Sequence, residues 1–247
     1  MLKEAIEKLV GLNPSPIQTV PVGDRTFINS NQYPEILPPK FSKPDVVSFS
    51  QLSGLVSFAE TMASDPGIDD TLVFIIESPS MVSLYGSLQP ENSNKRFLYA
   101  GAKLNFIPFK FGSFISIEEA VIGIQSLFYR DEDCETILDL LSNIVDESLV
   151  TLEDSGMSQT VNIKTGITTK SKVQVPKTVK AAPYRTFPEI HQPSSTFILR
   201  FKKSGGGLTC AIFEADGGAW KIEAVENIAN WLEVTTGKIS LDIPIIA

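Results

Sequence analysis

The chain has 247 residues, of which 43% are hydrophobic and 20% are charged, a composition typical of a soluble globular protein with a full core. Its formal net charge is −8, and because nonspecific nucleic-acid binding depends on phosphate neutralisation by Lys and Arg, this balance argues against DNA as a partner. The apolar runs fall short of the about 20 residues that a membrane-spanning helix needs, and the two distant cysteines imply no disulfide framework. We therefore expect a cytoplasmic protein without membrane contact.

Residues 1–45 are rich in proline and hold seven of the 16 prolines in the chain. Proline fixes φ and removes a backbone donor, so this stretch is expected to form an extended arm after a short helix over about 2–10. The arm either wraps its own domain or a neighbouring chain, or is a plain surface connection, and the residues favour neither alternative.

The first elements after the arm follow from hydrophobic periodicity and turn residues. Ser50 is predicted to cap a helix that has an apolar stripe from Leu52 to Met62. A capping box from Ser116 to Glu119 predicts the start of a second helix. Three strands in an antiparallel meander are predicted over 71–77, 81–88 and 96–106. A third helix is predicted over about 131–152.

Charges are sorted along the middle of the chain. Residues 112–154 contain eleven carboxylates against a single base, Arg130, whereas residues 160–185 contain six bases and no acid. The basic block alternates polar with β-branched residues, which predicts a polar β arm at about 158–186. This sorting predicts either pairing between the acidic helical block and the basic strands or a local anion site.

The C-terminal part predicts a hairpin, a helix and a final strand. The hairpin joins 197–201 to 208–213, the helix spans about 220–234, and Pro244 places a strand over 239–245 at a sheet edge. The whole pattern indicates an α+β fold with antiparallel sheets and hairpins and about four to five helices. We expect one such domain over 46–247, preceded by the arm of residues 1–45.

Catalytic motifs are missing from the pattern. The single histidine, His191, lies in a proline-flanked stretch without a nucleophile at motif spacing. One histidine and two distant cysteines do not supply the usual zinc ligand set, and no phosphate loop or dinucleotide fingerprint occurs. We therefore expect a protein that is not an enzyme and that needs no metal or cofactor.

The strongest candidate for a ligand site is basic and aromatic. Arginine binds phosphate through two hydrogen bonds, and aromatic rings stack on bases. The alternative is that these bases pair with the acidic helical block while the aromatic rings close the core. The candidate residues are Lys180, Tyr184, Arg185, Phe187, His191, Arg200 and Lys202.

Part of this region carries a resemblance to a known family. The sequences PYRTFPEIHQP at 183–193, FILR at 197–200 and FEADGGAW at 213–220 resemble the YfdQ-like family of phage and prophage proteins of unknown function. The resemblance implies a phage origin and action in the cytoplasm of an infected bacterium. The family has no assigned catalytic residues, so it implies none here.

These observations lead to a hypothesis of binding rather than catalysis. The first function that we consider is a phage-encoded oligomer that sequesters a small anionic nucleotide-type ligand and so counters host immunity. The alternatives are an accessory protein of phage recombination or replication, or a structural or interaction protein. A homo-oligomer is expected in each case, because a polar two-stranded arm is only marginally stable by itself.

Overall fold

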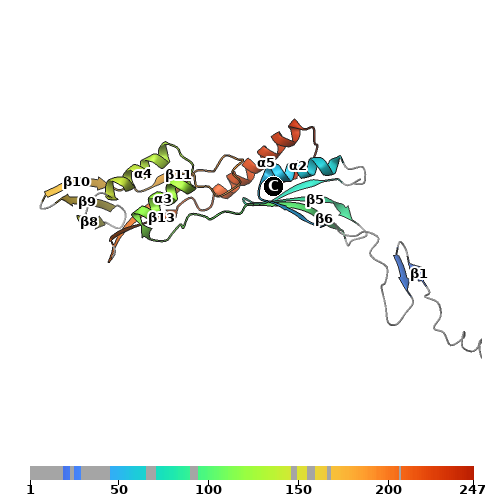
Figure 1. The fold of residues 1–247 in the computed structure, drawn as a ribbon, viewed down its shortest axis with the longest axis horizontal. Coiled ribbons are helices and arrows are strands. Elements are labelled where there is room, and N and C mark those ends of the chain that lie inside the picture. The colour runs from blue at the N-terminus through green and yellow to red at the C-terminus, as the bar shows by residue number, and fades with distance from the viewer. Residues whose placement is uncertain are drawn as a thin grey trace, which may run out of the picture. The chain divides into compact units, whose positions relative to one another are not determined.

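The computed structural model describes residues 19–22, 25–28, 45–64, 71–89, 94–145, 149–154, 159–165, 168–205 and 207–247. The chain divides into two compact units, Met1–Asp45 and Val46–Ala247. In the first unit, β1 (Thr19–Val22) and β2 (Arg25–Ile28) form an antiparallel hairpin (Figure 1). The helix predicted over about 2–10 lies outside the described residues.

The second unit begins with a five-stranded sheet in the order β14-β4-β5-β6-β3. Its three central strands are antiparallel, which confirms the predicted meander, and the two short edge strands run parallel to their neighbours. The final strand predicted over 239–245 is at a sheet edge but its bounds are wrong, because α5 extends to Lys238 and the strand β14 starts only after Pro244. The strands are β3 (Val47–Phe49), β4 (Val73–Ser78), β5 (Met81–Gln89), β6 (Lys95–Lys103) and β14 (Ile245–Ile246).

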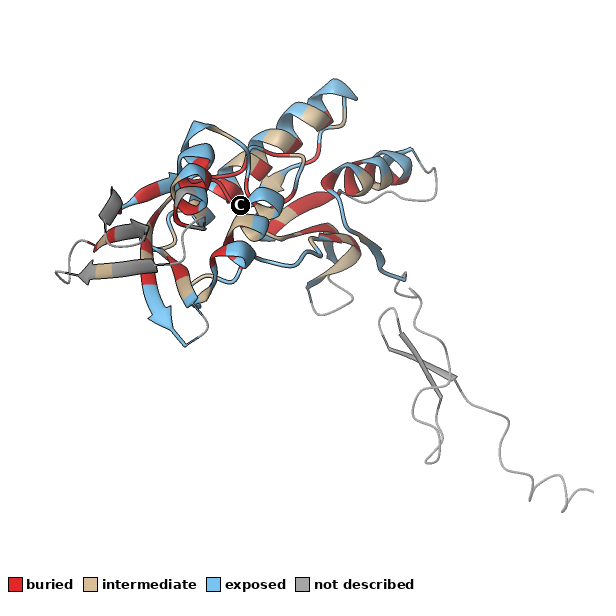
Figure 2. Ribbon diagram, turned by 60° about the vertical axis from the view of Figure 1, so that its left-hand side comes forward, coloured by how far each residue is buried: buried red, intermediate tan, exposed pale blue. Residues whose placement is uncertain are grey.

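Helices α2 (Leu52–Ala63) and α5 (Trp220–Lys238) pack against this sheet and against each other (Figure 1). The predicted stripe of α2 is confirmed, because its apolar residues from Leu52 to Met62 are buried on the side that faces the sheet (Figure 2). The predicted cap is wrong, because the N-cap residue is Gln51 and its side chain makes no capping hydrogen bond. Instead, a carboxylate oxygen of Glu189 accepts hydrogen bonds from the backbone and the hydroxyl of Ser53.

A second sheet has the antiparallel order β11-β12-β13-β7. Its strands are β7 (Ile115–Ser116), β11 (Val179–Ala181), β12 (Ser195–Ser204) and β13 (Gly207–Glu214), and β12 and β13 form the predicted hairpin. Helices α3 (Ile117–Leu127) and α4 (Glu132–Val145) pack on it around a core of their own. The predicted capping box at Ser116 is confirmed.

A third, three-stranded sheet contains the polar β segment. Strands β8 (Leu149–Asp154), β9 (Gln159–Thr165) and β10 (Thr168–Gln174) pair antiparallel. The prediction that the third helix continues to about residue 152 is wrong, because α4 ends at Val145. Residues 149–154 form the strand β8, which pairs with β9. The arm predicted over 158–186 is also shorter, since β11 belongs to the second sheet.

The fold class is α+β, as predicted, with four helices among the described residues. No helix in the part of the chain that the structure describes is long and apolar enough to span a bilayer.

Candidate functional site

The segment of residues 183–193 joins the two cores of the second unit. At its start, Pro183 forms an isolated antiparallel bridge with Phe128, just after α3. The hydroxyl of Thr186 then donates a hydrogen bond to the carbonyl of Pro79, in the turn between β4 and β5. Phe187 is fully buried in the core beneath α2 and α5. The 183–193 segment therefore contacts residues of both cores.

The side chain of Gln192 closes this segment into a fixed loop. Its amide oxygen accepts hydrogen bonds from the backbone nitrogens of Arg185 and Thr186. Its amide nitrogen donates to the carbonyls of Phe187 and Ile190. Gln192 is buried, so these bonds satisfy backbone groups that would otherwise be costly to remove from water.

Arg185 is buried inside this loop with only 6% of its surface exposed. Nη1 donates to Oε1 of Glu214 over 2.7 Å, and Nη2 donates to the hydroxyl of Ser195 over 2.6 Å. Its guanidinium carbon lies 4.1 Å from the ring centroid of Trp220, a cation–π contact. Burial lowers the pKa of Arg185, while the hydrogen bond and charge of Glu214 act in the opposite direction.

Asp216 extends the network on the other side of Ser195. The hydroxyl of Ser195 donates to Oδ2 of Asp216, and the backbone nitrogen of Gly218 donates to Oδ1 over 3.0 Å. Burial acts to raise the pKa of Asp216, but these two hydrogen bonds and the charge of Arg185 outweigh it and hold the pKa below its ordinary value. Arg185 thus takes its acidic partners from the end of β13 and the following turn. For Arg185, the alternative that the basic block pairs with the acidic helical block is wrong.

A small cavity of about 260 Å³ lies beside this network. Its lining includes the side chains of Lys180, Asp216, Trp220 and Glu223, with no Arg185 among them. Two carboxylates against one ammonium do not make an attractive site for a phosphate group. The cavity is therefore poorly suited to the anionic ligand that the sequence pattern predicts.

The structure does not bring the predicted ligand residues together. Arg185 and Phe187 are buried, whereas Lys180 is exposed and lines the small cavity. Arg200 and Lys202 lie on β12, where the ammonium of Lys202 is 5.8 Å from the ring centroid of Phe114. Tyr184 and His191 form a further pair whose side chains are exposed.

Tyr129 joins the exposed pair, and the exposed Arg130 follows it in the chain, although the sequence pattern selected neither for the site. The backbone nitrogen of Tyr129 donates to the carbonyl of Ala182, and that of Tyr184 donates to the carbonyl of Leu127. Side chains alternate across such a ladder, so Tyr129 and Tyr184 lie diagonally on the same side of it. The rings of Tyr129 and His191 are 6.5 Å apart between centroids. We call Tyr129, Arg130, Tyr184 and His191 the aromatic–basic surface.

Groups that could carry redox, metal or nucleophilic chemistry are few in the described ranges. Those ranges hold no cluster of three His, Cys, Asp or Glu side chains that could bind a metal ion. Both cysteines are free and buried, and burial raises the pKa of Cys210 to about 12. This thiol is therefore protonated at neutral pH and is a poor nucleophile.

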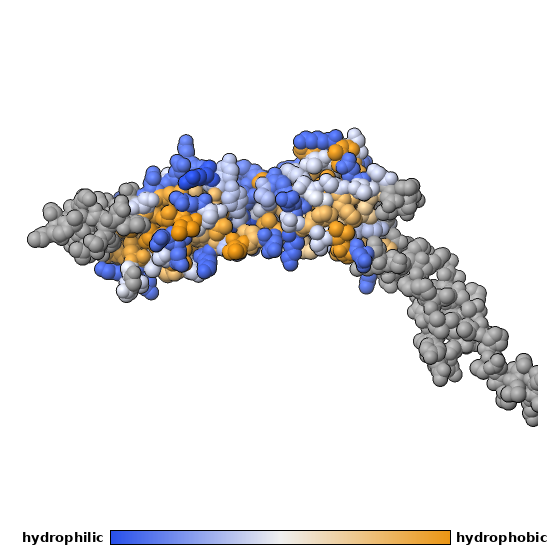
Figure 3. All heavy atoms as spheres, viewed as in Figure 1, coloured by the Kyte–Doolittle hydropathy of each residue, from blue (hydrophilic) through white to orange (hydrophobic). Residues whose placement is uncertain are grey.

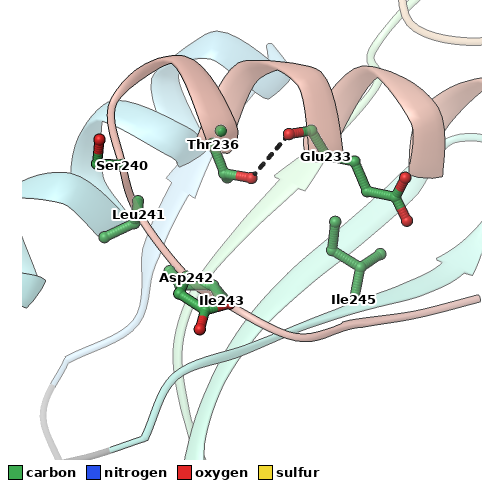
Figure 4. Close-up of a pocket in the computed structure, with 8 residues that line it drawn as sticks. Glu233, Thr236, Ser240, Leu241, Asp242, Ile243 and Ile245 are labelled. Carbon is green, nitrogen blue, oxygen red and sulfur yellow. Dashed lines mark hydrogen bonds between the residues drawn. The ribbon is translucent and has the colours of Figure 1, made fainter.

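A second and larger cavity, of about 390 Å³, lies at the C-terminal end of α5. Figure 4 shows Glu233 on the helix with Ile245 beneath it on the returning chain, and Asp242 and Ile243 nearer the turn. The buried hydroxyl of Thr236 donates to backbone carbonyls within the helix. Nothing in the sequence pattern indicated this cavity, because its lining is assembled by the turn after α5.

The fold and these sites define an α+β protein with a buried arginine network and an exposed aromatic–basic surface. The chain matches no family model, no curated protein and no solved structure. The resemblance to the YfdQ-like family stays a prediction.

Proposed function

We propose that this chain is a non-catalytic protein that associates with itself, and that the aromatic–basic surface makes the contact. The observation that carries the proposal is the placement of Arg185, whose guanidinium is used within the fold by Glu214, Ser195 and Trp220. The buried residues of the 183–193 segment therefore stabilise the fold, and its exposed residues can contact a partner. A phage origin and action in the bacterial cytoplasm follow from the family resemblance.

The exposed residues have the character of an interface. Tyrosine and arginine are enriched among the residues that dominate protein–protein binding. Tyr129 is 49% exposed and Tyr184 is 38% exposed, so both rings can lose area to a partner. Hydrophobic side chains also gather at the surface over α3 and β13 (Figure 3), where Ile122 is 58% exposed. An open surface of this kind favours a macromolecular partner over a small ligand.

A second candidate function is the binding of a small anionic nucleotide on the same surface. The rings of Tyr129 and His191 lie close enough to contact one nucleotide base together. Thermal-shift measurements with cyclic di- and trinucleotides test it. Stabilisation that disappears in a Tyr129→Ser/Tyr184→Ser variant would favour the nucleotide, whereas self-association alone predicts no stabilisation.

Size-exclusion chromatography with light scattering tests the self-association directly. We expect the wild-type chain at tens of micromolar to have the mass of more than one subunit, and the Tyr129→Ser/Tyr184→Ser variant to be shifted toward the monomer. Leu88→Ser is the matched control, because Leu88 is an exposed apolar residue of β5 outside the surface. A wild-type chain that is monomeric under these conditions would overturn the proposal.

A further inference from the structure

We infer that the small cavity beside the Arg185 network binds a free amino acid, a small zwitterion that carries one ammonium and one carboxylate group. The inference goes beyond the proposed self-association and does not depend on it. It rests on two observations: both cores of the second unit contribute to the cavity, and charged groups of both signs line it.

The small cavity lies where the two cores of the second unit meet. Lys180 of β11 and Thr196 of β12 come from the second sheet, whereas Trp220 and Glu223 belong to the first turn of α5, which packs on the first sheet. Ligand sites occur preferentially at such junctions, and pockets for drug-sized ligands begin at about 300 Å³. A cavity of about 260 Å³ therefore suits a molecule smaller than a nucleotide.

Lys180 and Glu223 bring opposite charges to the cavity from the two cores. Both side chains are exposed, and neither forms an ion pair with another residue that the structure describes. A zwitterion can pair with both at the same time, through its carboxylate and its ammonium.

The wider surroundings of the cavity are balanced in charge. The charged groups in its lining and next to it are Lys180, Arg185, Lys221, Glu214, Asp216 and Glu223. Because three bases face three acids there, net charge favours neither a phosphate compound nor a polyamine. A ligand that is neutral overall but carries both charges fits this balance.

Asp216 offers a second acceptor for the ammonium group. Its pKa is held below the ordinary value of 3.8, so the carboxylate is ionised at neutral pH. Its two oxygens each accept one hydrogen bond, from Ser195 and from Gly218, and a carboxylate has about four acceptor positions in all. Ser195 is 3% exposed and is held between Arg185 and Asp216. This polar wall is formed before a ligand binds, which reduces the entropic cost of binding.

Trp220 supplies an apolar wall of the cavity and a spectroscopic reporter. Its ring is half-buried and is held in place by the guanidinium of Arg185. The other tryptophan of the chain, Trp231, packs against the core of the first sheet. A Trp231→Phe variant therefore leaves Trp220 as the only source of indole fluorescence, and a ligand in the cavity should change its emission.

Fluorescence titration of the Trp231→Phe variant tests the ligand class. We expect at least one of the standard amino acids to change the emission of Trp220 saturably, with a dissociation constant below about 1 mM. The decarboxylated amine and the N-acetyl derivative of that amino acid each lack one charge and should bind at least about tenfold more weakly. No saturable change with any standard amino acid at about 10 mM would overturn the inference, and so would equal binding of the amine.

Removal of each charge, in the same Trp231→Phe background, tests the site. Lys180→Gln and Glu223→Gln should each raise the dissociation constant about tenfold, since each loses one charge-assisted hydrogen bond. Both residues are exposed, so these variants should fold, and thermal unfolding without ligand checks this. Lys177→Gln and Glu226→Gln are the matched controls, because both residues are exposed and neither lines the cavity. An affinity that stays unchanged in both Lys180→Gln and Glu223→Gln would overturn the site.

Light scattering of the same samples separates this inference from the proposed function. A monomeric wild type that binds the amino acid removes the self-association and supports the inference. An oligomer that binds no amino acid overturns the inference and leaves the self-association in place.

Discussion

The guanidinium of Arg185 lies over the indole ring of Trp220, with its central carbon 4.1 Å from the ring centroid. This contact ties the 183–193 segment to the first turn of α5, and the ion pair with Glu214 ties it to β13. A residue type that often binds phosphate is thus used here as an internal connection between two parts of one unit.

Replacing this arginine should cost stability rather than ligand affinity. We expect Arg185→Ala to lower the free energy of unfolding by about 3 kcal/mol, because the buried guanidinium loses its packing on Trp220 and the buried Ser195 loses its partner. The midpoint of thermal unfolding should fall by roughly 6–12 °C. Lys95→Ala is the control, since Lys95 is an exposed base of β6 outside the aromatic–basic surface, and it should leave the midpoint nearly unchanged. Equal effects of the two substitutions would contradict the structural role of Arg185.

Asp216 should make the stability depend on pH. Its pKa in the folded protein lies below the ordinary value of 3.8, so its stabilising contribution is present above that value and is lost as the pH falls through the folded pKa. Asp216→Asn should therefore be less stable than wild type at about pH 7, and the difference should shrink toward about pH 3. Urea unfolding at several pH values measures it. A difference that is independent of pH would contradict the ionised network.

The side-chain amide of Gln159 pairs with both backbone groups of Phe201, as the backbone of a neighbouring strand would. Its amide nitrogen donates to the carbonyl of Phe201 over 3.1 Å, and its amide oxygen accepts from the nitrogen of Phe201 over 2.9 Å. Gln159→Leu leaves the backbone nitrogen and carbonyl of Phe201 unpaired, so we expect the free energy of unfolding to fall by about 2–4 kcal/mol. The Phe201 amide should also exchange with deuterium faster. Gln125→Leu, at an exposed position of α3, should show neither effect.

Two helical glycines should respond with opposite signs to substitution by alanine. A Cβ at Gly123 would lie 2.8 Å from the ring of the buried Phe109, whereas a Cβ at Gly237 would meet nothing within 4 Å. Within a helix, alanine is more stabilising than glycine by about 1 kcal/mol in the interior and by less near an end. Overpacking of a core costs about 1–3 kcal/mol. Gly123→Ala should lower the melting midpoint, and Gly237→Ala should raise it slightly. A rise in both variants would contradict the packing.

Much of the fold can be predicted from the sequence, because residues close together in the chain determine many of its elements. The capping box at Ser116 and the stripe of α2 depend on residues a few positions apart, and both are confirmed. The antiparallel meander and the hairpin around residues 204–207 follow from alternation and turn residues in the same way.

The remaining elements depend on contacts that are distant in the sequence. At the start of α2, the hydrogen-bond acceptor is Glu189 rather than Ser50. Glu189 accepts from the backbone nitrogen of Ser53, which is 136 positions away in the sequence. Residues 149–154 fit a helical stripe, but pairing with β9 makes them a strand. The candidate site could not be predicted as a unit, because the bridge between Phe128 and Pro183 brings Tyr129 beside Tyr184.

The most direct test of self-association through the aromatic–basic surface is the NMR signal of the His191 ring. His191 is the single histidine of the chain and is exposed beside Tyr129, so its ring gives one assignable set of signals. We predict that these signals shift or broaden as the concentration rises from low micromolar to hundreds of micromolar, in step with the molar mass. Signals that stay unchanged while the mass increases would contradict the proposed surface.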